Sequence, residues 1–324
     1  MAEKLYLGLD VGSVSTNFAL LDQGGNLVYS SYLRTRGQPI KTVKSGLREL
    51  GDFLSLGQRI AGVGATGSGR NLAAVLVGAD VVKNEITAHA VAAGHACPGV
   101  NTVLEIGGQD SKLIILRHGV VVDFAMNSVC AAGTGSFLDQ QAARLGIPIE
   151  EFGQLALESQ NPVRIAGRCS VFAESDMIHK QQLGNSLQDI IAGLCDALVR
   201  NYLNNLAKGK NLQAPVVFQG GVAANAGIKR AFEKALGLEV VVPQHHGVMG
   251  ALGAALLARA QVKDKSTAFL GLAVSEKDHS SRSFCCPDCA NNCEIVELAC
   301  EDAVVARWGD RCGKWSALAD SRTG

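Results

Sequence analysis

Short hydrophobic runs separated by glycine-containing turns open the chain. The run Leu5–Gly12 leads into a group of polar residues, and the run Asn17–Asp22 ends in the turn Gly24–Asn26. A further apolar run, Leu27–Tyr32, follows that turn. Runs of this length bounded by turn residues are typical of strands. The pattern therefore predicts strands arranged as an antiparallel meander.

The same pattern returns about 95 residues further along the chain. Thr102–Lys112 is again an apolar run, a glycine turn and a group of polar residues. Leu113–Phe124 then holds two apolar runs on either side of a turn at Gly119. An approximate internal repeat of this kind indicates two domains of similar design that face each other.

Periodic segments outside the repeat predict the remaining elements. Helices are expected over Ile40–Leu54, Asn84–Ala96, several pieces of 135–206, and Val248–Ala260, and strands over Ile60–Gly64, Val216–Phe218 and Val240–Pro243. Past Gln261 the chain becomes polar, and its last 40 residues hold six cysteines. We therefore expect a first domain of residues 1–97 with 244–261, a second domain of 98–243, and a cysteine-rich tail of 262–324.

Composition narrows the functional class. The 324 residues carry 30 basic and 30 acidic side chains, and this balance argues against a protein that binds nucleic-acid backbones. No apolar run reaches the roughly 18 residues that a membrane span requires. The first residues do not resemble a signal peptide, so we expect a cytoplasmic protein. Ten cysteines in that compartment favour metal ligation or redox chemistry over disulfides.

Glycine turns follow a strand at Asp10–Ser15, at Ile106–Ser111 and at Gly220–Ala223. Glycine lets backbone N–H groups approach phosphate oxygens, because it has no Cβ to block them. Asp10 and Asp110 are candidates to hold a magnesium ion beside those phosphates. Each turn alone is also compatible with an ordinary hairpin, but their combination favours a nucleotide site. Neither the GxxxxGK[ST] loop nor the GxGxxG fingerprint follows a strand.

The order of these motifs resembles the actin, sugar-kinase and heat-shock-chaperone ATPase superfamily. Within it, the chain is most similar to the activators (reductases) of 2-hydroxyacyl-CoA dehydratases and benzoyl-CoA reductases, the BadF/BadG/BcrA/BcrD ATPase family. The resemblance covers about residues 4–260 and rests on LGLDVGSVSTN, ATGSGR, NEITAHA, IGGQDSK, CAAGTGSFLD, RCSVFAESD, GGVAAN and MGALGAAL. It implies an α/β fold of two repeated ribonuclease-H-like (actin-like ATPase) domains with a nucleotide cleft between them, here with a cysteine-rich C-terminal tail.

The resemblance also implies a set of site residues. Asp10, Gln109 and Asp110 would be catalytic, and the cofactors would be ATP or ADP with Mg²⁺. The nucleotide-binding residues would be Gly12, Ser13, Ser15, Thr16, Gly107, Gly108, Ser111, Lys112, Gly133, Thr134, Gly135, Gly220, Gly221 and Val222.

Cys130 and Cys169 are the candidate iron ligands. Each is expected to precede a helix, whose N-terminal N–H groups and dipole favour a thiolate and an anionic cluster. Two isolated cysteines would more often be core residues, and two cannot complete a four-thiolate site. A two-fold dimer supplies four. The family builds one [4Fe–4S] cluster in this way, between two subunits, and the flanking motifs imply the same here.

The tail has its own cysteine pattern. Cys286, Cys289 and Cys293 are spaced to place three thiolates around one metal, and Cys312 is a candidate fourth ligand. Strands are expected over Glu294–Leu298 and Ala303–Trp308. Zinc, a second iron–sulfur cluster and unligated cysteines all remain open for this segment, because the simplest activators lack it.

The resemblance implies a function of ATP-dependent electron transfer. A homodimer would take an electron from ferredoxin or flavodoxin and pass it at low potential to an iron–sulfur enzyme, either a dehydratase or a related multi-cluster reductase. A small-molecule kinase of the same superfamily is the alternative, and a chaperone-like ATPase is a weaker one, because the tail is a poor peptide-binding domain.

Other conspicuous residues are expected to be structural. Glu85 and His89 lie one helical turn apart without a zinc-protease pattern, and Cys97 and Cys195 are interpreted as core or surface thiols. Glu174–Asp176 is either surface charge or part of the cluster's surroundings.

Overall fold

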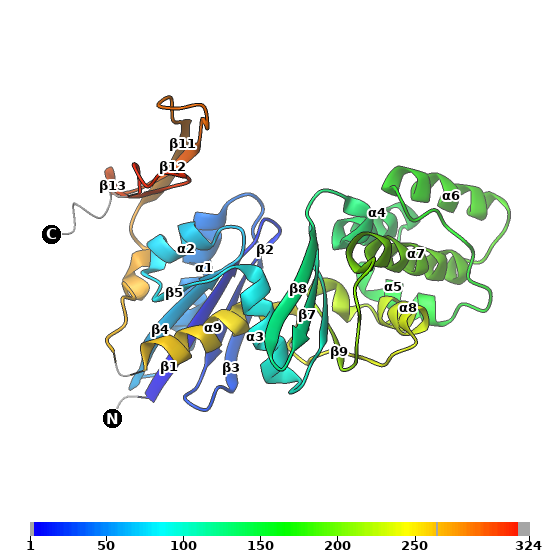
Figure 1. Ribbon diagram of the computed structural model, residues 1–324, viewed down its shortest axis with the longest axis horizontal. Helices are drawn as coiled ribbons and strands as arrows, with labels where there is room; N and C mark the ends of the chain where they lie inside the picture. The colour runs from blue at the N-terminus through cyan, green and yellow to red at the C-terminus, as the bar shows by residue number, and fades with distance from the viewer. Residues whose placement is uncertain (1–2, 264, 317–324) are drawn as a thin grey trace. The chain divides into compact units, whose positions relative to one another are not determined.

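The computed structural model describes residues 3–263 and 265–316, and the chain divides into two compact units. Unit 1 comprises residues 1–85 and 250–324, and unit 2 comprises residues 86–249. Each unit is built on a five-stranded mixed sheet with helices packed against it (Figure 1).

The sheet of unit 1 has the strand order β3-β2-β1-β4-β5. Its strands are β1 (Glu3–Val11), β2 (Ser15–Leu21), β3 (Leu27–Arg34), β4 (Gln58–Thr66) and β5 (Val81–Val82). The first three pair antiparallel, which confirms the predicted meander, and β4 pairs parallel to β1 after the helix α1 (Pro39–Phe53). The other helices are α2 (Arg70–Val77) and α9 (Met249–Val262).

The core of unit 1 forms where alternate strand residues meet α1. Leu7, Phe18 and Leu47 are fully buried there. On the other side α9 lies close against β1, and a Cβ on Gly8 would come within 1.9 Å of the Ala251 carbonyl oxygen. Glycine at this position is therefore what allows the helix backbone to approach the strand.

The sheet of unit 2 repeats this topology, with the strand order β10-β9-β6-β7-β8. Its strands are β6 (Thr102–Ile106), β7 (Ser111–Arg117), β8 (Val120–Asn127), β9 (Val216–Gln219) and β10 (Val240–Val241). β6, β7 and β8 form a second antiparallel meander, and β9 is parallel to β6. The predicted repeat is thus confirmed in the fold.

Helices cover both faces of the second sheet. One face packs against α3 (Glu85–Ala96) through Ala93 and Ile114, and the other packs against the remaining helices through Leu113 and Phe218. Those helices are α4 (Gly135–Leu145), α5 (Ile149–Leu157), α6 (Ser170–Gln182), α7 (Leu187–Tyr202) and α8 (Ala226–Leu236), with short turns η1 (Ala131–Gly133), η3 (Gly221–Ala224) and η4 (His246–Val248). A π-helical turn, η2 (Leu203–Ala207), extends α7.

The tail begins as part of unit 1. The turn η5 (Leu272–Ser275) buries Val274 in the core beside α1. A three-stranded antiparallel sheet follows, made of β11 (His279–Cys285), β12 (Glu294–Cys300) and β13 (Ala303–Trp308). The predicted strands β12 and β13 are confirmed, whereas β11 was not predicted, because none of its seven residues is buried. In the described part of the chain, no helix is both long and apolar enough to cross a bilayer.

Candidate functional site

The first predicted phosphate turn joins β1 to β2 in unit 1. The Gly12 N–H donates to the Ser15 carbonyl (2.8 Å), which closes the hairpin around Ser13. Ser15 and Thr16 belong to β2 rather than to the turn. Thr16 is fully buried, and its hydroxyl lies 3.0 Å from that of Thr35. The turn therefore offers backbone groups and Ser13, while Thr16 supports the hairpin from inside.

Asp10 lies at the end of β1, where α9 begins. Its side chain is half-buried, and a Cβ on Gly250 would come within 2.1 Å of Asp10 Oδ2. The carboxylate is thus packed against the first turn of α9, whose N-terminal end favours a negative charge. A glycine at position 250 is what leaves room for it.

The second phosphate turn joins β6 to β7 in unit 2. The Gly107 N–H donates to the Asp110 carbonyl (3.0 Å). The buried ammonium of Lys112 binds two carboxylates, that of Asp110 at 2.7 Å and that of Glu105 at 3.0 Å. Gln109 is exposed, whereas the Ser111 side chain is fully buried and its hydroxyl has no hydrogen-bond partner in the described residues.

Glu105 is a site residue that our sequence analysis missed. The two hairpins have the same register: Asp10 pairs with Asn17 across β1 and β2, and Glu105 pairs with Lys112 across β6 and β7. The pair Glu105–Lys112 lies 95 residues after the pair Asp10–Asn17. Glu105 therefore occupies the position in unit 2 that Asp10 occupies in unit 1. The internal repeat carried this signal, because its spacing matches Asp10 to Glu105 and not to Asp110.

The remaining predicted nucleotide residues of unit 2 gather around the second turn. The N–H groups of Gly135 and Ser136, which begin α4, donate to the carbonyls of Gly107 and Gly108 (2.8 Å each). Thr134 is buried and bonds its own turn at Ala131.

The turn after β9 reaches the same place. A Cβ on Gly220 would come within 2.8 Å of Glu105 Oε1, and one on Gly135 within 3.1 Å of the Val222 side chain. Gly133–Gly135 and Gly220–Val222 therefore form one group with Gly107 and Gly108. Asp10, Gly12 and Ser13 form the corresponding group of unit 1.

The structure brings the two candidate cluster cysteines to neighbouring loops. Cys130 Sγ lies 4.0 Å from the carbonyl oxygen of Arg168, the residue before Cys169. Cys169 is the N-cap residue of α6, and no side chain caps that helix end. Cys130 differs from expectation, because it precedes the single 3₁₀ turn η1, and α4 starts only at Gly135. Both thiols are partly exposed.

Side chains of neighbouring elements hold both cysteine loops. The amide of Asn127 binds the N–H and the carbonyl of Cys130, at 3.0 and 2.9 Å. Asn201 of α7 donates to the Gly167 carbonyl (2.6 Å), and its Oδ1 lies against Gly133 on the other loop. The Asp176 carboxylate accepts the Ala166 N–H (2.8 Å). The position of each cysteine is therefore set by the surrounding fold.

These residues fit a shared cluster better than a complete site within one chain. Among the described residues, no group of three or more His, Cys, Asp or Glu side chains converges on a metal position. Two partly exposed thiols on neighbouring loops, one at an uncapped helix end, supply half of a four-thiolate set. A second copy of the chain would supply the other half.

The tail brings two of its four candidate cysteines together, because the Cys286 N–H donates to the Cys293 carbonyl (2.8 Å). Cys286 is buried, where its Sγ donates to Asp288 (3.3 Å) and accepts from Trp315 Nε1 (3.2 Å), whereas Cys289 and Cys312 are exposed. Hydrogen bonds from Lys314, and then from Cys286, lower the pKa of Asp288. The described tail therefore has a polar cluster at Cys286, with Cys293 beside it.

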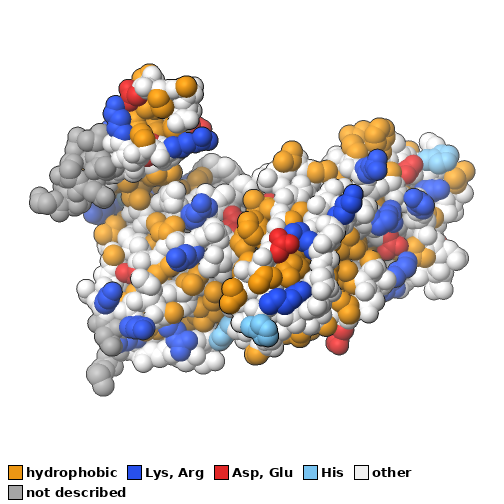
Figure 2. Space-filling model, viewed as in Figure 1, with side chains coloured by type: hydrophobic (Ala, Val, Ile, Leu, Met, Phe, Trp, Pro, Cys, Tyr) orange, Lys and Arg blue, Asp and Glu red, His pale blue; other side chains and the backbone are white. Residues whose placement is uncertain are grey.

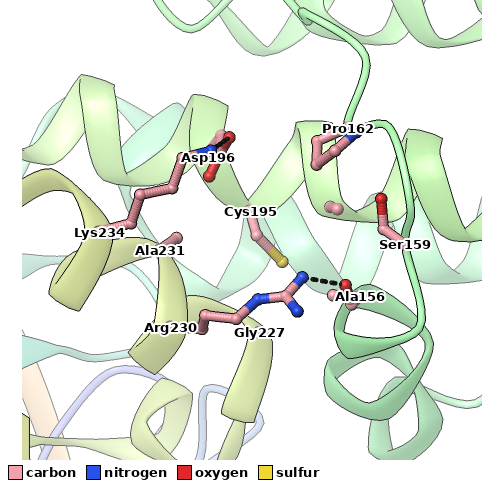
Figure 3. A pocket seen from close by; sticks show the side chains of 10 residues that line it. Ala156, Ser159, Pro162, Cys195, Asp196, Gly227, Arg230, Ala231 and Lys234 are labelled. Carbon is pink, nitrogen blue, oxygen red and sulfur yellow. Dashed lines mark hydrogen bonds and ion pairs between the residues drawn. The ribbon is translucent and has the colours of Figure 1, made fainter.

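A cavity of about 260 Å³ between α5, α7 and α8 does not have the chemistry of a reaction site (Figure 3). Its Arg230 guanidinium binds the last carbonyls of α5, those of Ala156 and Leu157, and Lys234 pairs with Asp196 at 3.1 Å. Burial raises the pKa of the Cys195 thiol far above its usual range, which keeps it neutral and unreactive. Cys195 is a core residue, as expected.

Comparison with known proteins adds to this geometry. The model of the BadF/BadG/BcrA/BcrD ATPase family matches residues 7–258. The 2-hydroxyisocaproyl-CoA dehydratase activator of Clostridioides difficile is 35% identical over 260 residues, covering 80% of this chain and 96% of that protein. The (R)-2-hydroxyglutaryl-CoA dehydratase activating ATPase of Acidaminococcus fermentans is 36% identical over 252 residues, covering 78% and 96%.

Solved structures agree with the sequence comparison. The activator of 2-hydroxyisocaproyl-CoA dehydratase from Clostridium difficile, with bound ADPNP, superposes with a TM-score of 0.72 at 34% identity, covering 80% of this chain and 96% of that one. A ROK family glucokinase from Streptomyces griseus reaches 0.51 at 16% identity, covering 79% and 99%, and this likeness concerns the fold alone. The fold is that of the actin-like ATPases, with a small antiparallel sheet added in the tail.

Proposed function

The chain belongs to the BadF/BadG/BcrA/BcrD ATPase family, and from that membership we propose that it is a homodimeric, ATP-dependent electron-transfer protein. Two relatives carry the names of dehydratase activators. We propose that this chain takes an electron from ferredoxin or flavodoxin and passes it at low potential to an iron–sulfur dehydratase or a related multi-cluster reductase.

In this proposal each of the two glycine turns is a phosphate-binding segment for MgATP, as in the family that the chain belongs to. The turn after Gly107 would bind phosphate oxygens through backbone N–H groups other than that of Gly107, which already donates to the Asp110 carbonyl. Asp10 orients the magnesium ion and its waters, and Glu105 and Asp110 share the charge of Lys112. Lys112 is therefore a positioning residue that keeps two carboxylates beside the turn.

Cys130 and Cys169 of each of two chains would hold one [4Fe–4S] cluster, which supplies a one-electron carrier. The observation that carries the proposal is the 4.0 Å approach of Cys130 Sγ to the Arg168 carbonyl, since it brings the loop of Cys130 against the loop that leads into Cys169. Nucleotide turnover would change the position of α6 and α7, which carry or support the cysteine loops. No step is assigned to a tail metal.

A small-molecule kinase would use the same turns but needs a base beside the transferred phosphoryl group. A kinase would not require two cysteine-bearing loops that are both held by α7. Phosphorylated product formed from ATP by iron-free protein would favour the kinase.

The test is the metal content of anaerobically purified protein carrying Cys130→Ser. The wild-type protein is expected to hold about two irons and two sulfides per subunit, because a four-iron cluster is shared by two chains. Cys130→Ser is expected to lose this iron while still binding a fluorescent ATP analogue, because the glycine turns are untouched. Zinc is measured on the same samples, since retained zinc belongs to the tail.

Cys97→Ser is the matched control, because Cys97 is also partly exposed but ends α3 on another part of unit 2. It is expected to keep the iron content of the wild type. Iron retained in Cys130→Ser, or wild-type protein without iron after reconstitution, would overturn the electron-transfer function and leave an ATPase.

A further inference from the structure

One end of the three-stranded sheet of the tail, drawn in orange to red in Figure 1, gathers cysteines from two segments of the chain. β11 ends at Cys285, β12 begins at Glu294 and β13 ends at Trp308, and neighbouring strands are antiparallel. The turn between β11 and β12 and the segment after β13 therefore leave the sheet at the same end, which we call the cysteine end. Its cysteines are Cys286, Cys289 and Cys293 in the turn and Cys312 in the segment.

Two of these cysteines face each other across the turn. The ladder of β11 and β12 ends with the pair Cys285 and Glu294, and one step further the Cys286 N–H donates to the Cys293 carbonyl (2.8 Å). Residues that face each other on antiparallel strands point to the same side, with Cβ atoms about 4.5–5.5 Å apart. Zinc binds thiolate sulfur at about 2.3 Å, so both side chains can reach one ion.

The segment after β13 folds back over this turn. Trp315 Nε1 donates to Cys286 Sγ (3.2 Å), and Lys314 forms an ion pair with Asp288, in the middle of the turn. These two contacts fix the segment that carries Cys312 against the turn that carries the other three cysteines.

The backbone of both segments bends sharply to make this approach. Asn292 in the turn, and Gly309 and Gly313 on either side of Cys312, have positive φ angles of 43°, 111° and 77°. A Cβ on Gly309 would come within 2.2 Å of the Glu294 carbonyl oxygen. The chain that leads to Cys312 therefore passes directly beside the start of β12.

The charges at the cysteine end suit an anionic metal site. Four thiolates around one Zn²⁺ leave an excess of negative charge. The cationic groups of Arg307 and Lys314 lie 5.4 and 5.6 Å from the ring centre of Trp315, whose N–H already donates to Cys286. Groups of this kind around the ligands stabilise and orient a metal site. Asp288, which accepts the Cys286 thiol proton, keeps its partner Lys314 when that proton is lost.

The sheet itself has a small core. Ile295 and Leu298 of β12 are fully buried, but no residue of β11 is buried. Figure 2 shows hydrophobic side chains at the surface of this part of the chain, at the upper left. Small sheets with few buried side chains are marginally stable, and a structural metal is one of the means by which small folds compensate.

We propose that Cys286, Cys289, Cys293 and Cys312 bind one zinc ion that stabilises the tail. Cys286 and Cys293 are already adjacent, whereas Cys289 and Cys312 are exposed and turn toward the ion as it binds. Among the described residues no three such side chains converge beforehand, so binding of the ion and closure of the site are one event. Each cysteine binds as a thiolate and releases its proton. With four protein ligands the site has no open position, so its role is structural.

Tryptophan fluorescence of the full-length protein reports on the tail alone, because the two tryptophans of the chain are Trp308 and Trp315. Zinc and iron are measured on protein purified without oxygen from zinc-supplemented cells. The wild type is expected to hold about one zinc per subunit. Removing it with a chelator should shift the emission to longer wavelength, because Trp315 loses its contacts with Cys286 and Phe284. Adding zinc alone should reverse the shift.

The test variant is Cys289→Ser/Cys312→Ser, and the matched control is Cys285→Ser/Cys300→Ser. Cys285 lies on the other face of the ladder from Cys286, and Cys300 faces His279 at the opposite end of the sheet. The test variant is expected to hold less than about a tenth of the wild-type zinc and to show the shifted emission without chelator. The control should keep both properties of the wild type. Unchanged binding of a fluorescent ATP analogue by both variants separates metal loss from misfolding of the chain.

Four results would overturn the zinc site: wild-type protein that holds no zinc after reconstitution, zinc retained in Cys289→Ser/Cys312→Ser, equal loss of zinc in the control, or loss of iron instead of zinc in the test variant. The last result would assign the four cysteines to an iron–sulfur cluster. The zinc site does not rest on the electron-transfer function, because Cys130 and Cys169 belong to unit 2. Protein with zinc and no iron would therefore remove electron transfer and keep this site.

Discussion

The ammonium of Lys112 is buried between two carboxylates. Removing one of these groups would leave an uncompensated buried charge and so lower the free energy of unfolding. The side chains of Lys112 and Glu105 are 3% and 5% exposed. A buried ion pair adds little net stability, because desolvation offsets its attraction, but removing one partner leaves a buried charge. The second hairpin therefore depends on Lys112 more than a surface pair would suggest.

We expect Lys112→Met to lower the free energy of unfolding by about 3–5 kcal/mol, measured by urea denaturation without nucleotide. Glu105→Gln/Lys112→Met should recover part of this loss, because the uncompensated carboxylate is gone. Lys210→Met is the control, since Lys210 pairs with an Asp123 side chain that is 50% exposed. If Lys112→Met costs no more than the control, the buried pair does not stabilise the hairpin.

Individual residues show what could and could not be predicted from the sequence. Asp110 was identified from its glycine turn, whose polar residues have a recognisable spacing, and Lys112 from the resemblance of the IGGQDSK segment to the family. Glu105 was overlooked, because it lies inside the apolar run Thr102–Ile106, where a lone charge has no meaning until its cross-strand partner is known. The pairing of Glu105 with Lys112 is a matter of register, which only the fold provides.

The start of α7 holds the segment that leads toward Cys169. Ser186 caps the helix by accepting the Asp189 N–H (3.1 Å). The Asp189 carboxylate accepts the Ser159 hydroxyl (2.6 Å) and the N–H groups of Gln160 and Asn161. These bonds, first that from Ser159, lower the pKa of Asp189 from 3.8 to about 2.

A carboxylate with a lowered pKa stabilises the fold above its unfolded value and loses that contribution as the pH falls toward its folded value. We therefore expect wild-type stability to fall between pH 4 and 2 in part through Asp189. In Asp189→Asn the melting temperature should be lower at pH 7 and should depend less on pH below 5, followed by circular dichroism. Asp139→Asn, at an exposed position of α4, is the control. Parallel curves for the wild type and Asp189→Asn would contradict this role.

Helices and strands could be predicted where one of their faces is buried, because apolar residues then recur with the period of a helix or a strand. The meanders, α1, α3 and α9 were expected from apolar alternation or helical spacing, and the structure has them. The helix α8 was not predicted, although Asn225 is a good N-cap whose side chain accepts the Ile228 N–H (3.1 Å). It begins at Ala226, directly after the GGVAAN motif, which ends at the N-cap residue Asn225. Strand β11 has no buried residue, so its sequence has no alternation to detect.

At the scale of the whole chain, the tail is joined to unit 1 through the segment 265–277. Asp80 accepts the Thr267 hydroxyl and the Ala268 N–H, at 2.7 Å each. Arg48 of α1 pairs with Glu276 at 2.8 Å. Val274 is 3% exposed and lies in the core of unit 1. The cysteine-bearing strands come only after this segment.

Two truncations separate these parts. A chain ending at residue 262 removes the whole tail, and we expect unit 1 to lose at least about 2 kcal/mol of unfolding free energy, the value of one buried aliphatic side chain. A chain ending at residue 277 keeps Val274 and is expected to stay close to full-length stability. Denaturant unfolding of unit 1, followed by circular dichroism, compares them. Equal stability of both truncations would show that the segment 265–277 does not support unit 1.

The burial of Val274 in the core of unit 1 has an evolutionary consequence. The part of the chain that matches the family model ends at residue 258, so the tail lies outside the part that family members share. Once Val274 covers the part of the core beside α1, the residues that it buries are no longer under selection to remain polar. Losing the extension would then expose an apolar surface that earlier sequences had no reason to hide. A segment that fills a face of the core in this way becomes harder to lose than one that only lies on the surface.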